Sequence, residues 1–457
     1  MMPRTLGAVA RETGGRLLGA DAPFGGVSTD TRTLSPGALF VAIAGDRFDG
    51  HDFVADACAK GAAGALVSRR ASSPLPQVEV RDTRRGLGAM ARAWRMAFAL
   101  PAVAITGSSG KTTVKELVAS ILGVSRAICA TQGNLNNDVG VPLTILTLSA
   151  EHDALVVELG ASRAGEIDYL ASLAQPTVAV ITNAAAAHLQ GFGSVAGVAA
   201  AKGELLDHLP RAGTAVLNAD DPFRGDWLAR APCEDRVTFG FAGTADCRVV
   251  GEPDYGASGS EFTLRLPDGD EVDVWLPLLG RQNVANALAA AAAAQAAGAS
   301  TEDISDGLAH VVPVRGRLRA VAGRHGATLI DDSYNANPAS VRAALDHLDV
   351  LGGRRILVLG NMAELGGAAR DLHREIGEYA RGRCDLLLAI GDLAGEAAAA
   401  FGAGGRRIDD IDAAREVLVP LLDEDVTVLI KGSRVMGLDR LVRTLEAAAD
   451  LPEAAVC

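Results

Sequence analysis

The residues best suited to chemistry form the segment Thr106–Thr113, which reads Thr-Gly-Ser-Ser-Gly-Lys-Thr-Thr. The apolar run Ala102–Ile105 before it predicts a buried strand, and Val114–Leu122 after it predicts a helix. Glycines between a strand and a helix let backbone N–H groups converge on an anion, the helix dipole favours negative charge, and the lysine adds a cation. The spacing departs from the usual glycine-rich motif because Ile105 stands five residues before Gly110. In its strand–turn–helix context, this segment predicts a site for a nucleoside triphosphate.

Two oxygen-bearing side chains stand where a magnesium ion would accompany the phosphates. Thr112 directly follows the lysine of the motif, and Glu158 ends the apolar run Ala154–Val157, which predicts the next strand. Magnesium prefers oxygen ligands, and an acidic residue at the end of an apolar strand is more typical of a ligand than of a core residue. These two residues are therefore candidate magnesium ligands.

His188 and Lys202 follow the third predicted strand, Thr177–Ile181. His188 lies in the loop after that strand, and Lys202 lies on a predicted helix from about Val195 to Leu209. Taken alone, a loop histidine and a helical lysine are more often solvated side chains than ligands. The residue types alone therefore do not decide whether His188 and Lys202 are ligands or solvated side chains.

A third unit, in which strands and helices again alternate, starts near Val314. Its predicted strands are Ala327–Ile330, Arg355–Leu359, Leu386–Ile390 and Val426–Ile430. Ligands of such sheets bind at the carboxyl ends of the strands, and Asp332, Asn361 and Lys431 fall there. The pattern predicts a Rossmann-like sheet without a full dinucleotide-binding fingerprint.

Polar residues also gather where the second unit gives way to the third. Arg317 falls at the expected hinge, and an arginine delivered from a neighbouring domain can neutralise a phosphate during its transfer. The segment Asp331–Pro338 ends a predicted strand and starts a helix, with Asn337 at the N-cap and Pro338 as the first helical residue. Helix capping does not explain the two aspartates and the tyrosine of this segment, so they are candidate ligand residues.

Residues 1 to about 85 predict a small α/β module with strands at Leu39–Ile43 and Ala65–Val67. Two polar clusters, Ser28–Arg32 and Asp46–Asp52, lie beside glycines or turns. Such dense sets of hydrogen-bonding groups suit a polar ligand, but ordinary loops and caps account for them equally well.

The chain as a whole predicts an α/β protein of three domains: a small α/β domain, a central P-loop domain with a doubly wound parallel sheet, and a C-terminal Rossmann-like domain. The expected boundaries are 1–85, 86–313 and 314–457, and a helix from about Thr83 to Phe98 leads from the first domain into the second. Within the central domain, the alternating segment from about Val237 to Leu276 predicts antiparallel hairpins.

The composition favours a soluble multidomain protein and argues against several classes of partner. The length of 457 residues fits about two to three domains, and 49% hydrophobic with 22% charged residues is typical of a soluble globular protein. The net charge of −13 and the 4% aromatic content argue against nucleic acid or an anionic membrane as a partner. The six cysteines are scattered, and no apolar signal segment or membrane span is evident, so we expect reduced thiols in a cytoplasmic protein.

The combined pattern resembles the Mur ligases, the ATP-dependent amide-bond-forming enzymes of peptidoglycan synthesis, over nearly the whole chain. The segments that carry the resemblance are, in order, Ser28–Arg32, Asp49–Phe53, Thr106–Thr113, Thr131–Asn137, Glu158–Ser162, Thr182–Asn183, Ala187–Leu189, Gly191–Ser194, Lys202–Glu204, Gly316–Leu318, Asp331–Pro338, Met362–Gly366 and Lys431–Arg434. Within the family, Asp332–Pro338 matches the branch that adds the dipeptide D-alanyl-D-alanine to a UDP-linked tripeptide.

The resemblance implies a reaction in two steps. ATP would activate the terminal carboxylate of UDP-N-acetylmuramoyl-tripeptide as an acyl phosphate, and the amine of D-alanyl-D-alanine would then displace phosphate to give the pentapeptide precursor. The resemblance also implies two magnesium ions beside ATP and a UDP-substrate-binding role for the small N-terminal domain. Nothing in it requires more than a monomer.

Roles for single residues follow from the same resemblance. Lys111, His188, Lys202 and Arg317 would form the catalytic set. ATP would contact Gly107, Ser108, Ser109, Gly110, Lys111, Thr112, Thr113, Asn283, Arg317, Asp332 and Tyr334. One magnesium ion would take Thr112 and Glu158, and a second would take His188 and Lys202, the lysine being carbamylated and thus an anionic oxygen ligand. The UDP-linked substrate and the dipeptide would contact Ser28, Thr29, Asp30, Arg32, Asp49, His51, Asn134, Asn136, Asn137, Asn335, Asn337, Lys431 and Arg434, the last two at the dipeptide's carboxylate.

Two positions depart from the family pattern. Gln282 stands where histidine usually precedes Asn283, and Asn361 stands where aspartate commonly precedes Met362.

Two kinds of alternative function remain. A sister ligase that adds a diamino acid, or a folate polyglutamylating enzyme, fits the segment Asp332–Pro338 less well, and the chain has no Asp-Asn-Pro-Arg segment of the kind found in diaminopimelate-adding relatives. A nucleotide-gated binding module would leave the N-terminal polar loops and Lys202 without a role.

Overall fold

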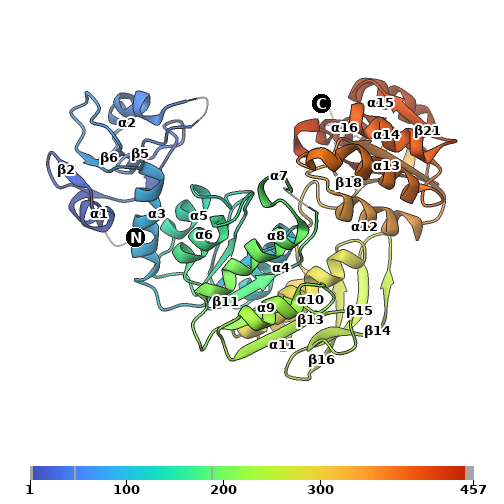
Figure 1. The fold of residues 1–457 in the computed structure, drawn as a ribbon, viewed down its shortest axis with the longest axis horizontal. Coiled ribbons are helices and arrows are strands. Elements are labelled where there is room, and N and C mark those ends of the chain that lie inside the picture. The colour runs from blue at the N-terminus through green and yellow to red at the C-terminus, as the bar shows by residue number, and fades with distance from the viewer. Residues whose placement is uncertain (1–3, 46–47, 187–188, 448–457) are drawn as a thin grey trace, which may run out of the picture.

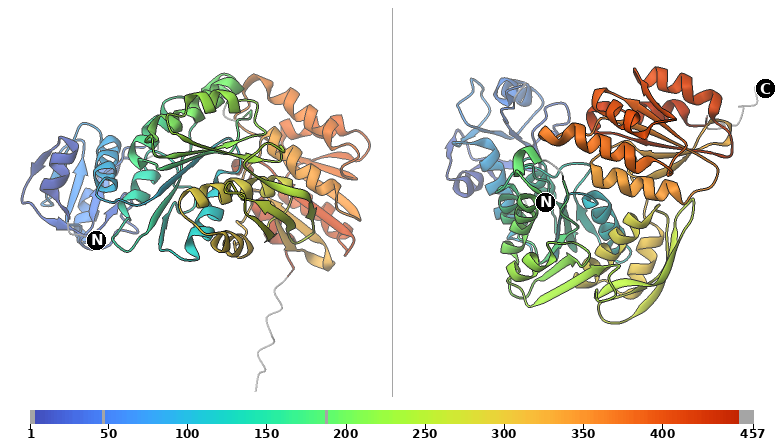
Figure 2. Two further views of the ribbon diagram at one scale, coloured as in Figure 1. Left: turned by 90° about the horizontal axis from the view of Figure 1, so that it is seen from below. Right: turned by 45° about the vertical axis from the view of Figure 1, so that its right-hand side comes forward.

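The computed structural model describes residues 4–45, 48–186 and 189–447. Within these residues the strands form a five-stranded, a nine-stranded and a six-stranded sheet in chain order, with a further two-stranded sheet at the N-terminus. In Figure 1 the N-terminal unit stands at the left and the C-terminal unit at the right, both above the central unit, and Figure 2 gives two further views. The predicted α/β architecture with three units is confirmed.

The first unit is built on the five-stranded sheet, in the order β2-β7-β6-β5-β4. Its elements are β1 (Arg4–Thr5), α1 (Leu6–Thr13), β2 (Arg16–Leu18), β3 (Pro23–Phe24), β4 (Val27–Ser28), β5 (Leu39–Val41), a 3₁₀ turn (Gly50–Phe53), α2 (Val54–Ala59), β6 (Gly64–Val67) and β7 (Gln77–Glu79). β4 to β7 run parallel, and β2 pairs antiparallel with β7. The side chains of β5 and β6 are buried on both faces, as expected for parallel strands at the centre of a covered sheet.

The central unit is built on the nine-stranded sheet, in the order β16-β15-β14-β13-β12-β11-β8-β10-β9. Its strands are β8 (Ala102–Thr106), β9 (Ile128–Ala130), β10 (Ala154–Glu158), β11 (Val178–Ile181), β12 (Thr214–Asn218), β13 (Asp235–Gly240), β14 (Cys247–Tyr255), β15 (Ser260–Arg265) and β16 (Glu271–Leu276). Its helices are α4 (Lys111–Gly123), α5 (Gly140–Leu146), α6 (Glu166–Ala174), α7 (Leu189–Phe192), α8 (Val195–Gly203), α9 (Arg224–Arg230), α10 (Arg281–Ala296) and α11 (Thr301–Ala309).

Alternate side chains of β8 point to opposite faces of the central sheet, because successive residues of a strand do so. Val103 and Ile105 join the core formed with α4, α10 and α11, whereas Ala102 and Ala104 join the core formed with α5, α6 and α3 (Thr83–Arg95). Helices therefore cover both faces, and the prediction of a doubly wound sheet is confirmed.

The predicted antiparallel hairpins are correct only for the last three strands of this sheet. β14 pairs antiparallel with β15, and β15 pairs antiparallel with β16 across the turn that contains Asp268 and Gly269. β13, by contrast, is parallel to both β12 and β14, so the prediction was wrong for the strand that includes Val237. Asp235 and Arg236 at the start of β13 are exposed. The strand therefore alternates polar and apolar residues as a hairpin strand does, although it belongs to the parallel part of the sheet.

α3 connects the first two units. The carboxylate of Asp82 caps its N-terminus by accepting a hydrogen bond from the N–H of Arg84 at 2.8 Å. The helix contacts α1 of the first unit and α5 and α6 of the central unit. Near its C-terminus, the indole N–H of Trp94 donates to the carbonyl of Leu148 at 3.0 Å, which ties the helix to the central unit.

The alanine-rich helix α10 lies in the core of the central unit. Ala287–Ala294 are all buried, and the helix contacts α4 and β13. Small side chains allow helices to approach closely, so the alanines reflect close packing against the phosphate-loop helix. In the described part of the chain, no helix is long and apolar enough to cross a membrane.

The C-terminal unit is built on the six-stranded sheet, in the order β17-β18-β22-β19-β20-β21. Its strands are β17 (Arg319–Ala322), β18 (Thr328–Asp332), β19 (Arg354–Gly360), β20 (Leu386–Ile390), β21 (Gly405–Ile408) and β22 (Val426–Lys431). Its helices are α12 (Pro338–Asp349), α13 (Ala369–Ala380), α14 (Asp392–Phe401), α15 (Ile411–Leu418) and α16 (Asp439–Leu445). β17 is antiparallel to β18, and the other pairs are parallel.

The four predicted strands of this unit are present, and the two edge strands are additional. β17 and β21 each have exposed or half-buried side chains, including Arg406 and Arg407 in β21. Edge strands bury less apolar surface than central ones, so they carry no apolar run by which a sequence pattern could identify them.

The close contact between α11 and α4 gives a prediction about stability. A Cβ atom at Gly307 would lie 2.3 Å from the Cα of Ile121, a backbone atom that cannot move aside alone. We expect Gly307→Ala to lower the free energy of unfolding by about 1–3 kcal/mol through overpacking, although alanine is the better helix former. Urea or thermal denaturation followed by circular dichroism measures the change. Gly225→Ala in α9 is the matched control, because a Cβ there meets nothing within 4 Å; an equal loss in both variants would contradict the packing explanation.

Candidate functional site

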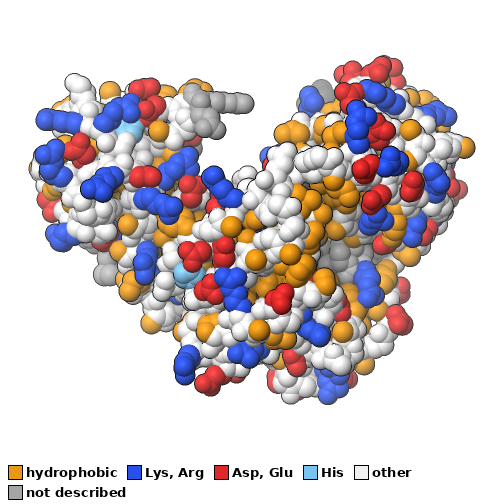
Figure 3. All heavy atoms as spheres, viewed as in Figure 1, with side chains coloured by type: hydrophobic (Ala, Val, Ile, Leu, Met, Phe, Trp, Pro, Cys, Tyr) orange, Lys and Arg blue, Asp and Glu red, His pale blue; other side chains and the backbone are white. Residues whose placement is uncertain are grey.

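A large cleft lies at the carboxyl edge of the central sheet. Its volume is about 1470 Å³, and it is lined by residues of α3, of the loop before α4, and of the C-terminal unit. None of the described residues before Asp82 lines it. The space-filling view in Figure 3 shows that the surface is hollowed between the N-terminal and C-terminal units.

The predicted phosphate loop has the geometry of an anion cradle. Gly107 has φ +150° and a Cβ there would lie 1.9 Å from the hydroxyl of Thr182, while Gly110 has φ +83° and its Cβ would lie 2.4 Å from Oδ1 of Asn286. Both positions therefore require glycine. α4 begins at Lys111 without a side-chain cap, so its first N–H groups are left for a ligand. This loop fits the phosphates of a nucleotide.

Lys111 is the first residue of α4, and its ammonium turns back toward the loop. Its Nζ donates to the carbonyl of Gly107 at 2.8 Å. Burial lowers the pKa of Lys111, Glu158 raises it, and the nearby Arg317 lowers it further. A half-buried cation beside a second cation is poorly compensated by the protein alone, which favours binding of an anion at this point.

Thr112 and Glu158 lie together, as a magnesium site requires. The hydroxyl of Thr112 donates to Oε2 of Glu158 at 2.8 Å, and the amide of Asn136 donates to Oε1 at 2.7 Å. Glu158 is 2% exposed, and its own N–H donates to the hydroxyl of Thr131 at 3.1 Å. A hydroxyl and a fixed carboxylate are ligands that suit Mg²⁺, so the residues present fit the ion.

Lys202 of α8 is almost fully buried, at 2% exposure. Burial, and then the charge of Lys111, lower the pKa of Lys202 to about 7. The ring of Phe192 lies beside its ammonium, with 5.4 Å from Nζ to the ring centroid, and the charges of Glu204 and Glu166 partly oppose the fall in its pKa. A lysine in this setting is not the solvated helix residue that composition alone would suggest. The second predicted residue of this pair, His188, lies outside the described residues.

The C-terminal unit contacts the phosphate loop directly. Nη2 of Arg317 donates to the hydroxyl of Thr112 at 3.1 Å, and the amide of Asn337 donates to the hydroxyl of Ser109 at 3.2 Å. The ring of Tyr334 contacts two guanidinium groups, with its centroid 4.2 Å from Cζ of Arg317 and 4.8 Å from Cζ of Arg434. Arg317, Tyr334 and Arg434, which are separated in the sequence, are thereby brought together.

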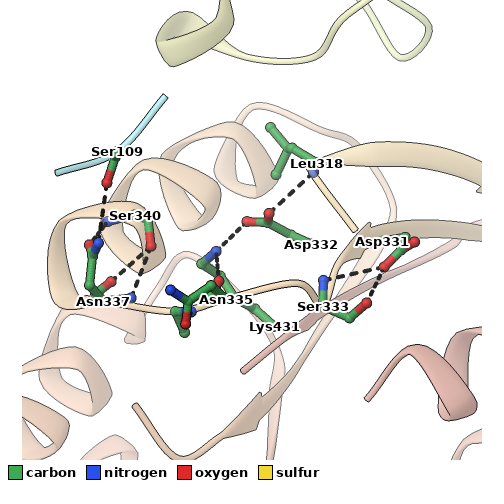
Figure 4. A network of polar contacts seen from close by, with 10 residues as sticks. Ser109, Leu318, Asp331, Asp332, Ser333, Asn335, Asn337, Ser340 and Lys431 are labelled. Carbon is green, nitrogen blue, oxygen red and sulfur yellow. Dashed lines mark hydrogen bonds and ion pairs between the residues drawn. The ribbon is translucent and has the colours of Figure 1, made fainter. Parts of the chain in front are cut away.

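Lys431 and Asp332 form a buried ion pair at the strand ends of the C-terminal sheet. Nζ of Lys431 lies 2.5 Å from Oδ2 of Asp332 and also donates to the carbonyl of Asn335 at 3.0 Å. Figure 4 shows this network together with the contact between Asn337 and Ser109. Burial raises the pKa of Asp332, and the Lys431 ammonium counteracts part of that rise.

Several predicted ligand residues have structural hydrogen bonds of their own. Asn283 is 4% exposed and donates to the carbonyl of Leu279 at 2.9 Å. Oδ1 of Asn137 accepts from the N–H of Gly140 at 2.9 Å, and Asn337 caps α12. Asn134 lines the cleft.

The N-terminal residues form two local clusters. The Asp30 carboxylate pairs with Arg32 at 2.6 Å, and hydrogen bonds from Arg32 lower the pKa of Asp30 to about 2. His51 is 7% exposed, with Nδ1 2.6 Å from Oδ1 of Asp49 and Nε2 accepting from the N–H of Ser68 at 2.9 Å. Ser28 bonds to the backbone of Asp30. Both ring nitrogens of His51 are thus occupied within the protein.

The two departures from the family pattern have different surroundings. Oδ1 of Asn361 accepts from the N–H of Ala394 in the first turn of α14 at 2.8 Å, so the asparagine retains the acceptor that an aspartate would offer there. Gln282 lines the cleft beside Asn283.

Two cleft residues, Asn183 and Asn286, were assigned no role from the sequence. Oδ1 of Asn183 accepts from the N–H of Ser109 at 3.0 Å, which shapes the phosphate loop. Asn286 lies beside Gly110 and donates to Oδ1 of Asn283 at 3.0 Å. The spacing of Asn283 and Asn286, three residues apart on one helix, places them on the same face and was the available signal.

Comparison with known proteins identifies the family. Residues 23–95 match the model of the Mur ligase family catalytic domain, 105–294 the Mur ligase middle domain, and 316–434 the Mur ligase glutamate ligase domain. A UDP-N-acetylmuramoyl-tripeptide–D-alanyl-D-alanine ligase from Escherichia coli (strain K12) is 43% identical, over 98% of this chain and 99% of that protein.

Solved structures agree in fold over nearly the whole length. MurF from Acinetobacter baumannii has a TM-score of 0.91 at 35% identity, covering 97% of this chain and 99% of that one. MurF ligase from Thermotoga maritima in complex with ADP has a TM-score of 0.82 at 27% identity, covering 92% of this chain and 96% of that one. On the matched domains, the near-complete coverage and this level of identity, the chain belongs to the Mur ligase family.

Proposed function

We propose that the chain joins D-alanyl-D-alanine to UDP-N-acetylmuramoyl-tripeptide with ATP, by way of an acyl phosphate, to give the UDP-N-acetylmuramoyl-pentapeptide precursor of peptidoglycan. The observation that carries the proposal is the 43% identity, along 98% of the chain, to a ligase named for this reaction. The convergence of Lys111, Arg317, Thr112 and Glu158 at one cleft supports ATP as the activating substrate.

In the first step, the terminal carboxylate of the tripeptide attacks the γ-phosphate of ATP and ADP leaves. Both reactants are anions, so cations must offset their repulsion. Lys111 and Arg317 are the described cations of this cleft that lie at the phosphate loop. Thr112 and Glu158 would hold a magnesium ion, which supplies further positive charge when it is bound.

In the second step, the amine of the dipeptide attacks the acyl carbon and phosphate leaves. The acyl phosphate must be kept from water in the interval. The contacts of Arg317 with Thr112 and of Asn337 with Ser109 support a role of the C-terminal unit in covering the loop.

The remaining residue roles follow the family resemblance. We propose UDP binding by the N-terminal residues Ser28, Thr29, Asp30, Arg32, Asp49 and His51, and adenosine binding by Asn283, Asp332 and Tyr334. Asn134, Asn136, Asn137, Asn335 and Asn337 would serve the peptide substrates. We retain domain boundaries of 1–85, 86–313 and 314–457, a monomeric state and a cytoplasmic location as predictions; the free thiols of the described cysteines suit a reducing compartment.

We propose that Lys202 carries a carbamate and, with His188, binds a second magnesium ion. A carbamate forms only on a neutral amine, and a lysine whose pKa lies at about 7 is neutral far more often than a solvated lysine. Carbamylation would turn the buried cation into an oxygen ligand and remove its repulsion with Lys111.

The proposed function is tested by phosphate release from ATP and Mg²⁺ with each organic substrate omitted in turn. We expect release to require both UDP-N-acetylmuramoyl-tripeptide and D-alanyl-D-alanine. Full release without the dipeptide would instead favour a sister ligase or a nucleotide-driven switch, and the dipeptide assignment would have to be withdrawn.

Removal of the loop lysine gives a second prediction. Lys111→Ala is expected to lower kcat by a factor on the order of 10² to 10³ or more, because a cation at the transferring phosphate is lost. The same phosphate-release assay measures it, and Arg265→Ala is the control, since Arg265 is 41% exposed on β15 and does not line the cleft. Near-normal turnover of Lys111→Ala would rule out the phosphate-loop assignment.

Carbamylation of Lys202 is tested by ¹³C NMR after incubation with ¹³C-labelled carbonate. A carbamate carbonyl signal is expected in the wild-type protein and not in Lys202→Gln. At constant dissolved CO₂ the signal should strengthen as the pH rises through about 7, since the neutral amine becomes the main form above its pKa. A spectrum without this signal at pH 8 would contradict the proposal.

A further inference from the structure

The segment that joins the central and C-terminal units holds Arg317 in a constrained backbone. Gly316 has φ +74° and Leu318 has φ +48°. Leu318 is not glycine, and a left-handed conformation there costs about 1–3 kcal/mol, which the surroundings must offset. Leu318 is also buried, at 4% exposure, immediately before β17.

The two aspartates at the end of β18 fix the backbone on both sides of Arg317. Oδ2 of Asp331 accepts from the N–H of Gly316 at 2.9 Å, and Oδ1 of Asp332 accepts from the N–H of Leu318 at 3.2 Å. The N–H of Tyr334 in turn donates to the carbonyl of Gly316 at 3.1 Å. The direction in which Arg317 leaves the chain is thereby set by the aspartates.

The Arg317 side chain crosses from this segment to the phosphate loop. Its Nη2 donates to Thr112, its guanidinium stacks on Tyr334, and its buried Nε has no hydrogen-bond partner within the described residues. The protein therefore makes few contacts with this half-buried guanidinium, so its position depends on the backbone that carries it.

Lys431 binds the carboxylate oxygen of Asp332 that does not contact Leu318. The two residues are register partners on the adjacent parallel strands β22 and β18. The Lys431 ammonium is 2% exposed and donates to the other carboxylate oxygen of Asp332 and to the carbonyl of Asn335. Figure 4 shows the chain of contacts from Lys431 through Asp332 to the N–H of Leu318.

We infer that Lys431 is a positioning residue, which orients Asp332 and through it the Leu318 backbone and Arg317, rather than a ligand of the dipeptide carboxylate. Only the expected change in kcat rests on the proposed function. Two of the three N–H groups of the ammonium are already used. Rotation toward a substrate carboxylate would leave Asp332 buried without its cation, which is strongly unfavourable.

The test replaces Lys431 by methionine in the full chain. We expect Lys431→Met to lower kcat by about ten- to a hundredfold, the cost of a misplaced catalytic cation, with the KM for D-alanyl-D-alanine unchanged. Amide hydrogen exchange at 314–319, measured without substrates, should become faster. Arg95→Met is the matched control, because Arg95 is also a buried cation but donates to the carbonyls of Ala174 and Phe98, and exchange at 314–319 should then remain as in the wild type.

A double variant separates positioning from ligand binding. In Lys431→Met with Asp332→Asn, no uncompensated charge is buried and the asparagine Oδ1 can still accept from Leu318. We therefore expect the double variant to recover part of the kcat lost in Lys431→Met at saturating ATP, which separates this effect from the proposed contact of Asp332 with adenosine. It is also the variant to measure if the single one does not fold.

The opposite pattern would overturn the inference. A tenfold or larger rise in the KM for the dipeptide, with wild-type kcat and wild-type exchange at 314–319, would make Lys431 a dipeptide ligand. Failure of the proposed function appears separately, as wild-type phosphate release that does not need the dipeptide, and the exchange measurement still decides the role of Lys431 in that case.

Discussion

Two cationic side chains, Lys111 and Arg317, lie at the N-terminus of α4, and the site is arranged around the repulsion between them and with the nearby Lys202. Arg317 and Lys111 oppose each other's charge, and Lys111 lowers the pKa of Lys202. Glu158 offsets only part of this, since it raises the pKa of Lys111 against the larger effect of burial. Positive charge held in a poorly solvated cleft is unfavourable until an anion enters. The cleft is therefore suited to a polyanion, whose binding would neutralise Lys111 of the central unit and Arg317 of the C-terminal unit together.

The parallel sheets explain how residues that are distant in the sequence come to line the same cleft. β8, β10 and β11 are neighbours in the central sheet, so Thr106, Glu158 and Thr182 all emerge at one edge. β18 and β22 are neighbours in the C-terminal sheet, which places Asp332 beside Lys431 in the same way. Both edges face the same cleft. The segment 314–318 must then span the two sheets in one fixed conformation, and the strand-end aspartates supply the acceptors that hold it.

The sequence predicted those parts that depend on local pattern. Apolar runs predicted the central strands, because parallel strands buried on both faces consist mainly of apolar residues. The glycine-rich loop predicted the phosphate site, because backbone at positive φ favours glycine. β21 escaped notice because an edge strand with Arg406 and Arg407 has no apolar run. The parallel pairing of β13 was missed because pairing direction is a tertiary property. Distant pairs such as Asn136 with Glu158, and Lys431 with Asp332, could not be read from spacing either, since the fold alone brings them within hydrogen-bond distance.

The ion pair between Lys431 and Asp332 is better explained by its orientation of neighbouring backbone groups than by its contribution to the free energy of unfolding. A buried ion pair contributes little net stability, because desolvation of the two charges offsets most of their attraction. An apolar pair of similar size would fill the same space, but it would offer no acceptor to the N–H of Leu318 and no donor to the carbonyl of Asn335. Both groups flank residues that contact the phosphate loop, namely Arg317 and Asn337. One oxygen of Asp332 binds the N–H of Leu318 and the other binds Lys431, which in turn binds the carbonyl of Asn335, so the pair fixes both segments from the ends of two adjacent strands.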